Sequence, residues 1–410
     1  MDNIAVIGAG ISGASVSRII SDLGGKPAVF EKSIKPGGLV KCEIVQGTLY
    51  HLTGGHVFNS KDSSVVNWFW SIFEKSDFVF AKRNAKILFG ERKVPYPIEN
   101  NLSFLERETT EKIVSELLSL KKESPSNFNE FLVSTFGDTL NEIYFKPYNE
   151  KIWKTDLSKV PLEWLEGKLP MPSVKDILTN NIYSIEESQM VHSSFYYPKN
   201  GGSQFIIDTL LRGVDLYANY EINSIVFTDG KLVLNNSHRF DKLIYTGNIK
   251  NMGSLFKTND SVLLELFARA TRLKSNGTSN VLCHIKECDS SWEYLPEPRF
   301  SAHRIIYTGN FSESNDAVGG RSAVIEFSGE IQKEEAFRLT RDMPFEVEPI
   351  AYNYTPYSYV IQDAESRDLI NKLKKALEKY NIYLLGRFAE WEYKNMDICM
   401  ADAMKITKKL

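Results

Sequence analysis

The fold is decided by residues 8–13, Gly8-Ala9-Gly10-Ile11-Ser12-Gly13, which directly follow the apolar run Ile4–Ile7. That run predicts a strand, Ile11–Leu23 predicts a helix, and Pro27–Phe30 predicts a second strand parallel to the first. The first two glycines permit a tight turn and let backbone N–H groups approach a pyrophosphate at the helix N-terminus, whereas Gly13 lets the helix pack closely on the strand. The chain is therefore predicted to begin with a βαβ nucleotide-binding unit.

Two features after the second strand indicate which dinucleotide this unit binds. Glu31 follows Gly13 at close to the spacing of about 20 residues at which a carboxylate accepts ribose hydroxyls, and an acid there argues against a 2′-phosphate. Gly37-Gly38 comes shortly afterwards, an extension typical of FAD-binding proteins with this fingerprint. We therefore favour FAD over NAD. The alternative is a helix–strand contact that uses the glycines without any ligand.

Length, charge and cysteine usage exclude several classes of protein. A chain of 410 residues suggests two or three domains, and a net charge of −3 gives no basic field for nucleic acid or an anionic membrane. The apolar start is broken by glycines and lacks the basic region of a signal peptide, and no apolar run is long enough for a membrane span. The four cysteines lack metal-like spacing. We expect a cytoplasmic protein without a metal site or a nucleic-acid partner.

The pattern changes from strands to helices near residue 100. A hairpin is predicted at Lys86–Pro97, before the change. Helical periodicity then predicts helices at Thr110–Lys122, Asn127–Phe136 and Leu140–Tyr148. The proline-rich stretch Pro161–Pro172 is expected to be an irregular loop.

The second half of the chain returns to strands and turns. Its C-terminal part predicts a strand, a glycine turn and a helix, which mirrors the beginning of the chain, so the nucleotide-binding domain is expected to be discontinuous. The predicted features are a stretch opening a helix at Tyr196–Gly202, a hairpin of Ile222–Phe227 with Leu232–Leu234, a strand at Lys242–Tyr245, a strand-rich block at Asn280–Tyr359, a helix at Ser366–Tyr380, a strand at Ile382–Leu385, a turn at Gly386-Arg387 and a last helix from about Met396.

These patterns predict an α/β fold class: a discontinuous Rossmann-like FAD-binding domain with a helical insertion and an antiparallel β-sheet domain. The FAD-binding domain is expected to comprise residues 1–100, 196–250 and 366–410. The helical substrate domain is expected at residues 101–195, and the antiparallel sheet domain at residues 251–365.

Six stretches together resemble the UDP-galactopyranose mutase family, within the flavin amine-oxidase and protoporphyrinogen-oxidase-like group. They follow the family's order at about its spacings and cover essentially the whole chain. These stretches are the fingerprint with Glu31 and Gly37-Gly38, Gly54-Gly55-His56-Val57-Phe58, Tyr148–Trp153, Leu243–Gly247, His303–Ile306 and Gly386–Met396.

The resemblance implies an isomerase that interconverts UDP-galactopyranose and UDP-galactofuranose, or a close analogue, in cell-surface polysaccharide biosynthesis. In that family's chemistry, N5 of a reduced flavin attacks the anomeric carbon and expels UDP without net redox change. The implied cofactor is FAD in its reduced form. The implied partners are a UDP-sugar and an external reductant such as NAD(P)H, and a homodimer is an open alternative to a monomer.

The resemblance also implies roles for individual residues. Arg304 matches the family arginine that touches the diphosphate and the flavin, Tyr393 matches a tyrosine that donates to the diphosphate, and His56 matches a histidine beside the flavin ring; these three are the expected catalytic residues. The expected substrate-binding residues are Tyr148, which matches the aromatic side chain stacked on uridine, with Trp153, Lys168, Phe195 and Asn395. The expected cofactor-binding residues are Gly8, Gly10, Ile11, Ser12, Gly13, Glu31, Lys32, Gly38, Leu39, His56, Gly386, Arg387, Asn395 and Met396.

The sugar side departs from the family's pattern at several positions. Lys168 is the nearest basic residue where the family has a loop arginine, Phe195 stands in place of a tyrosine, and Asn395 stands in place of an acid. Periodicity alone favours Tyr148 and Trp153 as core residues. Two alternatives therefore stay open: an FAD-dependent oxidase or desaturase of the amine-oxidase or protoporphyrinogen-oxidase type, and a non-catalytic protein that binds flavin or nucleotide.

Overall fold

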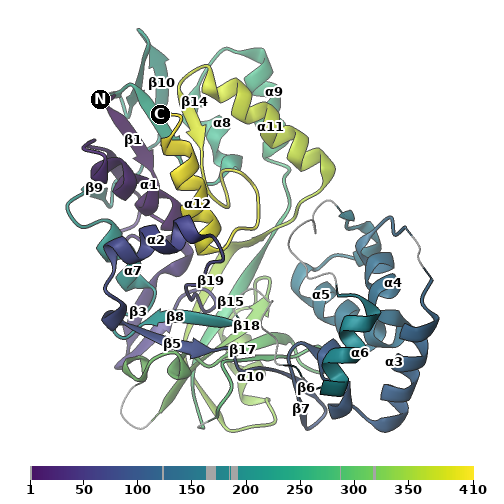
Figure 1. Cartoon of the computed structure of the whole chain (residues 1–410). Helices are drawn as coiled ribbons and strands as arrows, with labels where there is room; N and C mark the ends of the chain where they lie inside the picture. Colours follow the sequence, from purple (N-terminus) through teal and green to yellow (C-terminus); the bar gives the residue numbers. More distant parts are fainter. Residues whose placement is uncertain are drawn as a thin grey trace.

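The computed structural model describes residues 2–121, 124–162, 172–183, 185, 193–286, 288–316 and 320–410. Among them, strands form a five-stranded, a four-stranded and a seven-stranded sheet and two separate strand pairs. The helices of residues 107–183 stand apart at one side, and the two chain ends lie near each other at the opposite side (Figure 1). The predicted α/β class with a helical insertion is confirmed.

The five-stranded sheet is parallel throughout, in the order β20-β13-β1-β2-β9. Its strands come from three distant parts of the chain, which confirms that the nucleotide-binding unit is discontinuous; the domain boundaries themselves remain predictions. The strands are β1 (Ile4–Ile7), β2 (Ala28–Glu31), β9 (Asp215–Ala218), β13 (Lys242–Tyr245) and β20 (Ile382–Leu384).

Both faces of the parallel sheet are covered, because successive strand residues point to opposite sides. Ile4 and Val6 of β1 pack toward one set of helices, whereas Ala5 between them belongs to a core on the other face. The first set is α1 (Ile11–Asp22), α2 (Ser63–Ile72), α7 (Gln204–Leu210) and α12 (Met396–Thr407). The other face is covered by α8 (Met252–Leu255), α9 (Ser261–Ala270), α11 (Ala364–Glu378) and a sheet of β10 (Ile225–Thr228), β11 (Lys231–Leu234), β12 (His238–Phe240) and β14 (Phe256–Lys257).

The seven-stranded sheet has the order β19-β15-β18-β17-β16-β6-β7. Neighbouring strands are antiparallel except for β16 and β6, which run parallel. The sheet therefore joins the predicted hairpin to the predicted strand-rich block. Its elements are β6 (Ala85–Phe89), β7 (Arg92–Pro95), β15 (Ser275–Ile285), β16 (Trp292–Tyr294), β17 (Ala302–Ile306), β18 (Arg321–Ser328) and β19 (Val347–Val360), with helix α10 (Lys333–Arg341) packed on it.

The first two helices of the insertion lie within a few residues of their predicted bounds, a helix at Val174–Tyr183 was not predicted, and the third predicted helix differs in kind. The helix predicted at Leu140–Tyr148 is a π-helical turn, Asn141–Phe145, followed by α5. Pro147 lies in the first turn of α5 and has no N–H to donate, so the regular hydrogen-bond ladder is interrupted before it. The insertion comprises α3 (Arg107–Ser119), α4 (Phe128–Leu140), α5 (Lys146–Trp153) and α6 (Val174–Tyr183).

Two smaller differences concern strands. The strand predicted from Ile222 begins at Ile225, because the side chain of Asn235 accepts the N–H groups of Asn223 and Ser224 at 2.8 and 3.2 Å. Most of the predicted loop at Pro161–Pro172 lies outside the described residues. Two strand pairs were not predicted: β3 (Cys42–Val45) with β4 (Thr48–His51), and β5 (Phe78–Lys82) with β8 (Ser194–Pro198). In the described ranges, no helix combines the length and apolar character needed to cross a bilayer.

Candidate functional site

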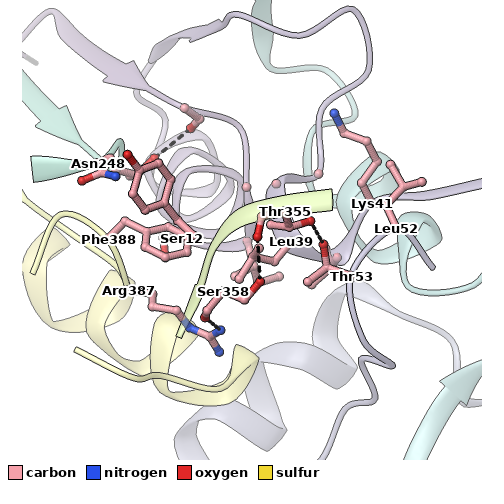
Figure 2. A pocket seen from close by; sticks show the side chains of 18 of the residues that line it. Ser12, Leu39, Lys41, Leu52, Thr53, Asn248, Thr355, Ser358, Arg387 and Phe388 are labelled. Carbon is pink, nitrogen blue, oxygen red and sulfur yellow. Dashed lines mark hydrogen bonds between the residues drawn. The ribbon is translucent and has the colours of Figure 1, made fainter. Parts of the chain in front are cut away.

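A cavity of about 910 Å³ is lined by residues of both the parallel sheet and the seven-stranded sheet. Side chains from the first turn of α1, from the stretch around Leu39 and from the C-terminal strand–helix turn enter it together (Figure 2). Most of the predicted site residues meet here. The lining includes Gly8, Gly10, Ile11, Ser12, Glu31, Lys32, Gly38, Leu39, His56, Arg304, Arg387, Tyr393, Asn395 and Met396.

Gly13 and Gly386 do not line the cavity. Each instead allows two segments of the cavity wall to pack closely. A Cβ atom on Gly13 would lie 1.9 Å from the carbonyl oxygen of Gly8, so only glycine lets α1 approach β1 this closely. Gly386 has a φ of 94°, and a Cβ there would lie 2.3 Å from Oγ of Ser12. Glycine at positions 13 and 386 therefore allows the N-terminus of α1 to lie close both to β1 and to the turn after β20.

The end of the cavity at α1 can hold a pyrophosphate and a ribose. The first N–H groups of a helix have no intrahelical partner, and here Gly10, Ile11 and Ser12 present them to the cavity. Glu31 is only 9% exposed; its two carboxylate oxygens accept the N–H groups of Ala9 at 2.8 Å and Ser33 at 2.9 Å. Each oxygen keeps a further lone pair, as ribose hydroxyls require.

The other end of the cavity is built on one row of the seven-stranded sheet. Tyr294 on β16 lies opposite Arg304 on β17, which lies opposite Glu326 on β18. Residues directly opposite each other share a face of the sheet, with Cβ atoms about 4.5–5.5 Å apart. The row continues through Asn280 on β15 to Asn353 on β19. Tyr294, Arg304, Glu326 and Asn353 all line the cavity.

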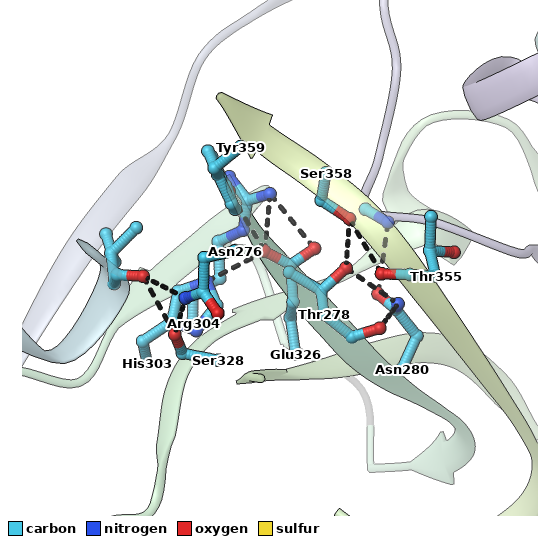
Figure 3. A network of polar contacts seen from close by, with 12 residues as sticks. Asn276, Thr278, Asn280, His303, Arg304, Glu326, Ser328, Thr355, Ser358 and Tyr359 are labelled. Atoms are coloured by element: carbon cyan, nitrogen blue, oxygen red, sulfur yellow. Dashed lines mark hydrogen bonds and ion pairs between the residues drawn. The ribbon is translucent and has the colours of Figure 1, made fainter. Parts of the chain in front are cut away.

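Glu326 is the centre of a buried polar network (Figure 3). Its Oε1 is 2.8 Å from Nη2 of Arg304 and 2.7 Å from Nε2 of His303, and it accepts the hydroxyl of Tyr359 at 3.1 Å. A register shift between Ala302 and Arg304 lets two consecutive side chains reach one carboxylate. Burial alone would raise the pKa of Glu326, but Arg304 and His303 outweigh it and hold that pKa well below its usual range.

The loop that carries His56 is tied to this sheet. Thr53 and Thr355 share a hydrogen bond of 2.6 Å between their hydroxyls, and the N–H of Gly54 donates to Asn280 Oδ1 at 3.1 Å. Burial, with help from Arg387, lowers the pKa of His56 to about 3, so its imidazole is neutral. Nε2 of His56 and Nε of Arg304 are buried polar atoms without a hydrogen-bond partner in the part of the chain that the structure describes.

The C-terminal turn closes the cavity from a third side. Arg387 donates to the carbonyl oxygens of Lys394 at 2.6 Å and Ser358 at 3.0 Å, and its guanidinium lies 4.4 Å above the ring of Tyr393. The ring of Tyr393 is in turn parallel to that of Tyr359, at a centroid distance of 5.9 Å. The turn is therefore fastened to β19, and Tyr393 is held between an arginine and an aromatic ring.

Three of the four predicted substrate residues that the structure describes do not line the cavity. Phe195 is a correction: it is 1% exposed and packs edge-on against Trp292 and Phe311, because strand alternation on β8 points it into the core. Tyr148 contacts the ring of Tyr294, and Trp153 the ring of Tyr359, so both lie behind cavity residues rather than among them. Lys168 lies outside the described residues. Asn395 lines the cavity.

Several cavity residues were missed by the sequence analysis. Lys394 lies within the quoted stretch Gly386–Met396 but was assigned no role, whereas the positions of Tyr294, Glu326 and Tyr359 depend on pairing between strands. The available signal in the sequence was Glu326 within an apolar strand. A buried carboxylate needs a cation, so this glutamate indicated a charged partner such as Arg304. The missed residues with charged or hydroxyl side chains include Lys41, Arg83, Tyr294, Glu326, Tyr359 and Lys394.

Comparisons with known proteins agree with this geometry. Residues 6–74 match the model of an NAD(P)-binding Rossmann-like domain. The chain is 21% identical to a UDP-galactopyranose mutase of Mycoplasma genitalium, over 100% of this chain and 94% of that protein. It is 20% identical to a dTDP-fucopyranose mutase of Escherichia coli, over 99% and 97% of the two chains.

The fold comparison leads to the same relatives. A crystal structure of reduced UDP-galactopyranose mutase superposes with a TM-score of 0.88 and 22% identity, covering 99% of this chain and 93% of that one. At this identity the likeness shows the fold. The resemblance predicted from the sequence is therefore confirmed: this chain is a homologue of proteins named UDP-galactopyranose mutase and has their fold.

Proposed function

We propose that the protein is a flavin-dependent nucleotide-sugar mutase that uses UDP-galactose or a close analogue. The observation that carries the proposal is the cavity itself, which joins the N-terminus of α1 to Arg304 and its buried partner Glu326. The names of the relatives support this proposal. They leave the nucleotide base of the substrate open, because one relative is named a dTDP-fucopyranose mutase.

FAD fits the residues at the α1 end. The N–H groups of Gly10, Ile11 and Ser12 would hold its pyrophosphate, and Glu31 would hold the ribose. The ring system would then extend toward the loop of His56, where a buried Nε2 lacks a partner among the described residues. When bound and reduced, the flavin supplies a nucleophilic nitrogen, N5, for the anomeric carbon.

Arg304 is proposed to bind the leaving diphosphate. A planar guanidinium matches phosphate geometry and stays charged throughout. Glu326 and His303 fix its orientation, which reduces the conformational entropy that binding would cost. The orphan Nε of Arg304 is a donor that a phosphate oxygen can satisfy. Tyr393 is proposed to donate its hydroxyl beside it.

His56 is proposed to act as a neutral hydrogen-bonding group rather than as a cation. Its pKa of about 3 means that the imidazole carries one N–H and one lone pair at neutral pH. It can therefore donate to or accept from the flavin edge without adding charge. Which nitrogen carries the proton would be set by the bound ring.

The test is a product assay. FAD-loaded protein, reduced with dithionite, is incubated with UDP-galactopyranose, UDP-galactofuranose or dTDP-fucopyranose, and the products are separated by chromatography. The proposal predicts pyranose–furanose interconversion only after reduction, without stoichiometric use of the reductant. Stoichiometric oxidation of an organic substrate with consumption of oxygen would instead identify an oxidase. Retention of FAD without nucleotide binding or turnover would identify a non-catalytic protein.

A further inference from the structure

The loop between β16 and β17, residues Leu295–Ser301, connects two residues of the cavity wall. Tyr294 directly precedes the loop, and Arg304 lies three residues after it. Two residues of the loop, Pro296 and Pro298, have no N–H group, so the loop has few backbone donors of its own. Its carbonyl oxygens therefore depend on a donor from elsewhere in the chain.

Lys151 supplies that donor from the last turn of α5. Its Nζ lies 2.6 Å from the carbonyl oxygen of Leu295, 2.8 Å from those of Glu297 and Phe300, and 3.4 Å from that of Ala302. An ammonium has three N–H groups, so the three shorter contacts use all of them. Hydrogen bonds from a charged donor are stronger than those between neutral groups. One half-buried ammonium therefore holds the loop near both of its ends.

The end of α5 that carries Lys151 is itself fixed on the seven-stranded sheet. The carbonyl oxygen of Ile152 accepts Nδ2 of Asn276 on β15 at 2.6 Å and Oγ of Ser328 on β18 at 2.8 Å. Asn276 and Ser328 lie beside Arg304 in the polar network (Figure 3). Lys151 therefore joins the loop to the same strands that carry the network around Glu326.

The loop determines where Arg304 points. Ala302, the first residue of β17, is the position at which the register against β18 shifts, and this shift brings both His303 and Arg304 to Glu326. A change of register by one residue would move Arg304 to the other face of the sheet, away from the cavity. The contacts of Lys151 just before this position restrain the loop that leads into the shift.

We propose that Lys151 is a positioning residue of the substrate site, which holds the loop between β16 and β17 so that Arg304 faces the diphosphate. This inference rests on the proposed function. It also gives the stretch Tyr148–Trp153 a role other than contact with the substrate. That stretch supports the cavity wall from behind, since the ring of Tyr148 packs on that of Tyr294 and the ring of Trp153 on that of Tyr359.

The experiment measures the affinity of FAD-loaded, reduced protein for UDP and for uridine by calorimetric titration. Lys151→Met keeps an unbranched side chain and removes the three donors. It should weaken UDP binding about 5- to 30-fold, because Arg304 is then held less precisely. Uridine affinity and FAD content should stay within about twofold of the wild type, since neither depends on Arg304 contacting a diphosphate.

Three further variants make the test decisive. Lys154→Met removes an exposed lysine at the end of the same helix and should leave every affinity unchanged. Lys151→Arg keeps a charged donor and should recover part of the UDP affinity; it also serves if Lys151→Met fails to fold. Arg304→Lys removes the planar fork that Lys151 is proposed to position. In that background Lys151→Met should change UDP affinity less than about twofold, whereas a general effect on the fold would be additive.

The outcomes separate the two proposals. Wild-type UDP affinity of Lys151→Met would overturn the role of Lys151 and leave the mutase proposal standing. An equal loss of uridine affinity, or a loss of the same size in the Arg304→Lys background, would also overturn it, because the effect would then not act through Arg304. Failure of the wild type to bind UDP would overturn both.

Discussion

The two proposed anion-binding ends of the cavity are built in different ways. At the α1 end, backbone N–H groups would bind the pyrophosphate, and glycines leave space for it free of side chains. At the sheet end, the charge would come from Arg304, whose position is set by the carboxylate of Glu326. The first end is sensitive to added atoms, whereas the second is sensitive to removed charges. This difference predicts different consequences for mutations at the two ends.

The largest effect is expected at the sheet end. Arg304→Met should lower the free energy of unfolding by about 3–5 kcal/mol, because Glu326, which is 1% exposed, would lose its main counter-charge. Urea denaturation at pH 7 measures this. The double variant Arg304→Met with Glu326→Gln should regain part of the loss, since no uncompensated charge remains. A loss below about 1 kcal/mol, which is typical of an exposed ion pair, would show that the buried charge of Glu326 does not depend on Arg304.

At the α1 end, Gly10→Val should act on the cofactor and not on the fold. A Cβ on Gly10 would meet nothing closer than Cα of Gly38 at 3.7 Å, which is an ordinary contact. In the pyrophosphate path, the added methyl groups should weaken FAD binding by about 1–3 kcal/mol. FAD occupancy and affinity are measured on protein reconstituted from the apo form. Full FAD retention would contradict the placement of the pyrophosphate at Gly10. Unfolding of the apo form would show that Gly10 is needed for packing instead.

Acid should destabilise the fold through His51, which lies on β4 just before the loop that carries His56. Burial lowers the pKa of His51 to about 4, and its Nε2 lies 2.7 Å from the hydroxyl of Tyr197. Its folded-state pKa is below the unfolded value of about 6.5, so the unfolded state binds more protons in this range and stability falls as the pH drops from about 6.5 toward 4. Between pH 7 and 5 this one residue should account for about 2 kcal/mol.

The variant His51→Asn isolates that contribution. It should be less stable than the wild type at pH 7 but should lose about 2 kcal/mol less between pH 7 and 5. Urea denaturation of both apo proteins across this range gives the two slopes. Parallel slopes would mean that His51 does not control the acid sensitivity of this region.

The smallest effect is expected for Tyr393→Phe. The ring keeps its place between Arg387 and Tyr359, and only one hydroxyl is removed. UDP affinity should fall by about 0.5–1.5 kcal/mol, with unchanged FAD content. A loss as large as that of an arginine variant would mean that the hydroxyl does more than contribute one neutral hydrogen bond.

The same difference between the ends explains what the sequence could predict. The α1 end depends on a short, continuous motif, so the turn between β1 and α1 and the end of β2 at Glu31 were predicted, and β13, β20 and α12 were found within a residue or so. The helix break before Pro147 was missed because apolar periodicity continues across it.

The sheet end depends on the pairing register of its strands, which a single sequence does not predict. Glu326 reaches both Arg304 and His303 only because β17 has an irregularity between Ala302 and Arg304. Arg83 joins them through β16, which runs parallel to β6. Phe195 was misplaced for the same reason: the resemblance gave its position along the chain but not the face of β8 on which it lies.

One cavity is proposed to bind a flavin dinucleotide at its α1 end and a nucleotide diphosphate at Arg304. Titration of UDP into FAD-loaded, dithionite-reduced protein tests it most directly, with Arg304→Ala as the matched variant and FAD content measured in each sample. We expect saturable one-to-one binding by the wild type and a loss of about 2–4 kcal/mol in the free energy of UDP binding in the variant. Equal UDP affinity in the two proteins, or no binding by FAD-loaded wild type, would contradict it.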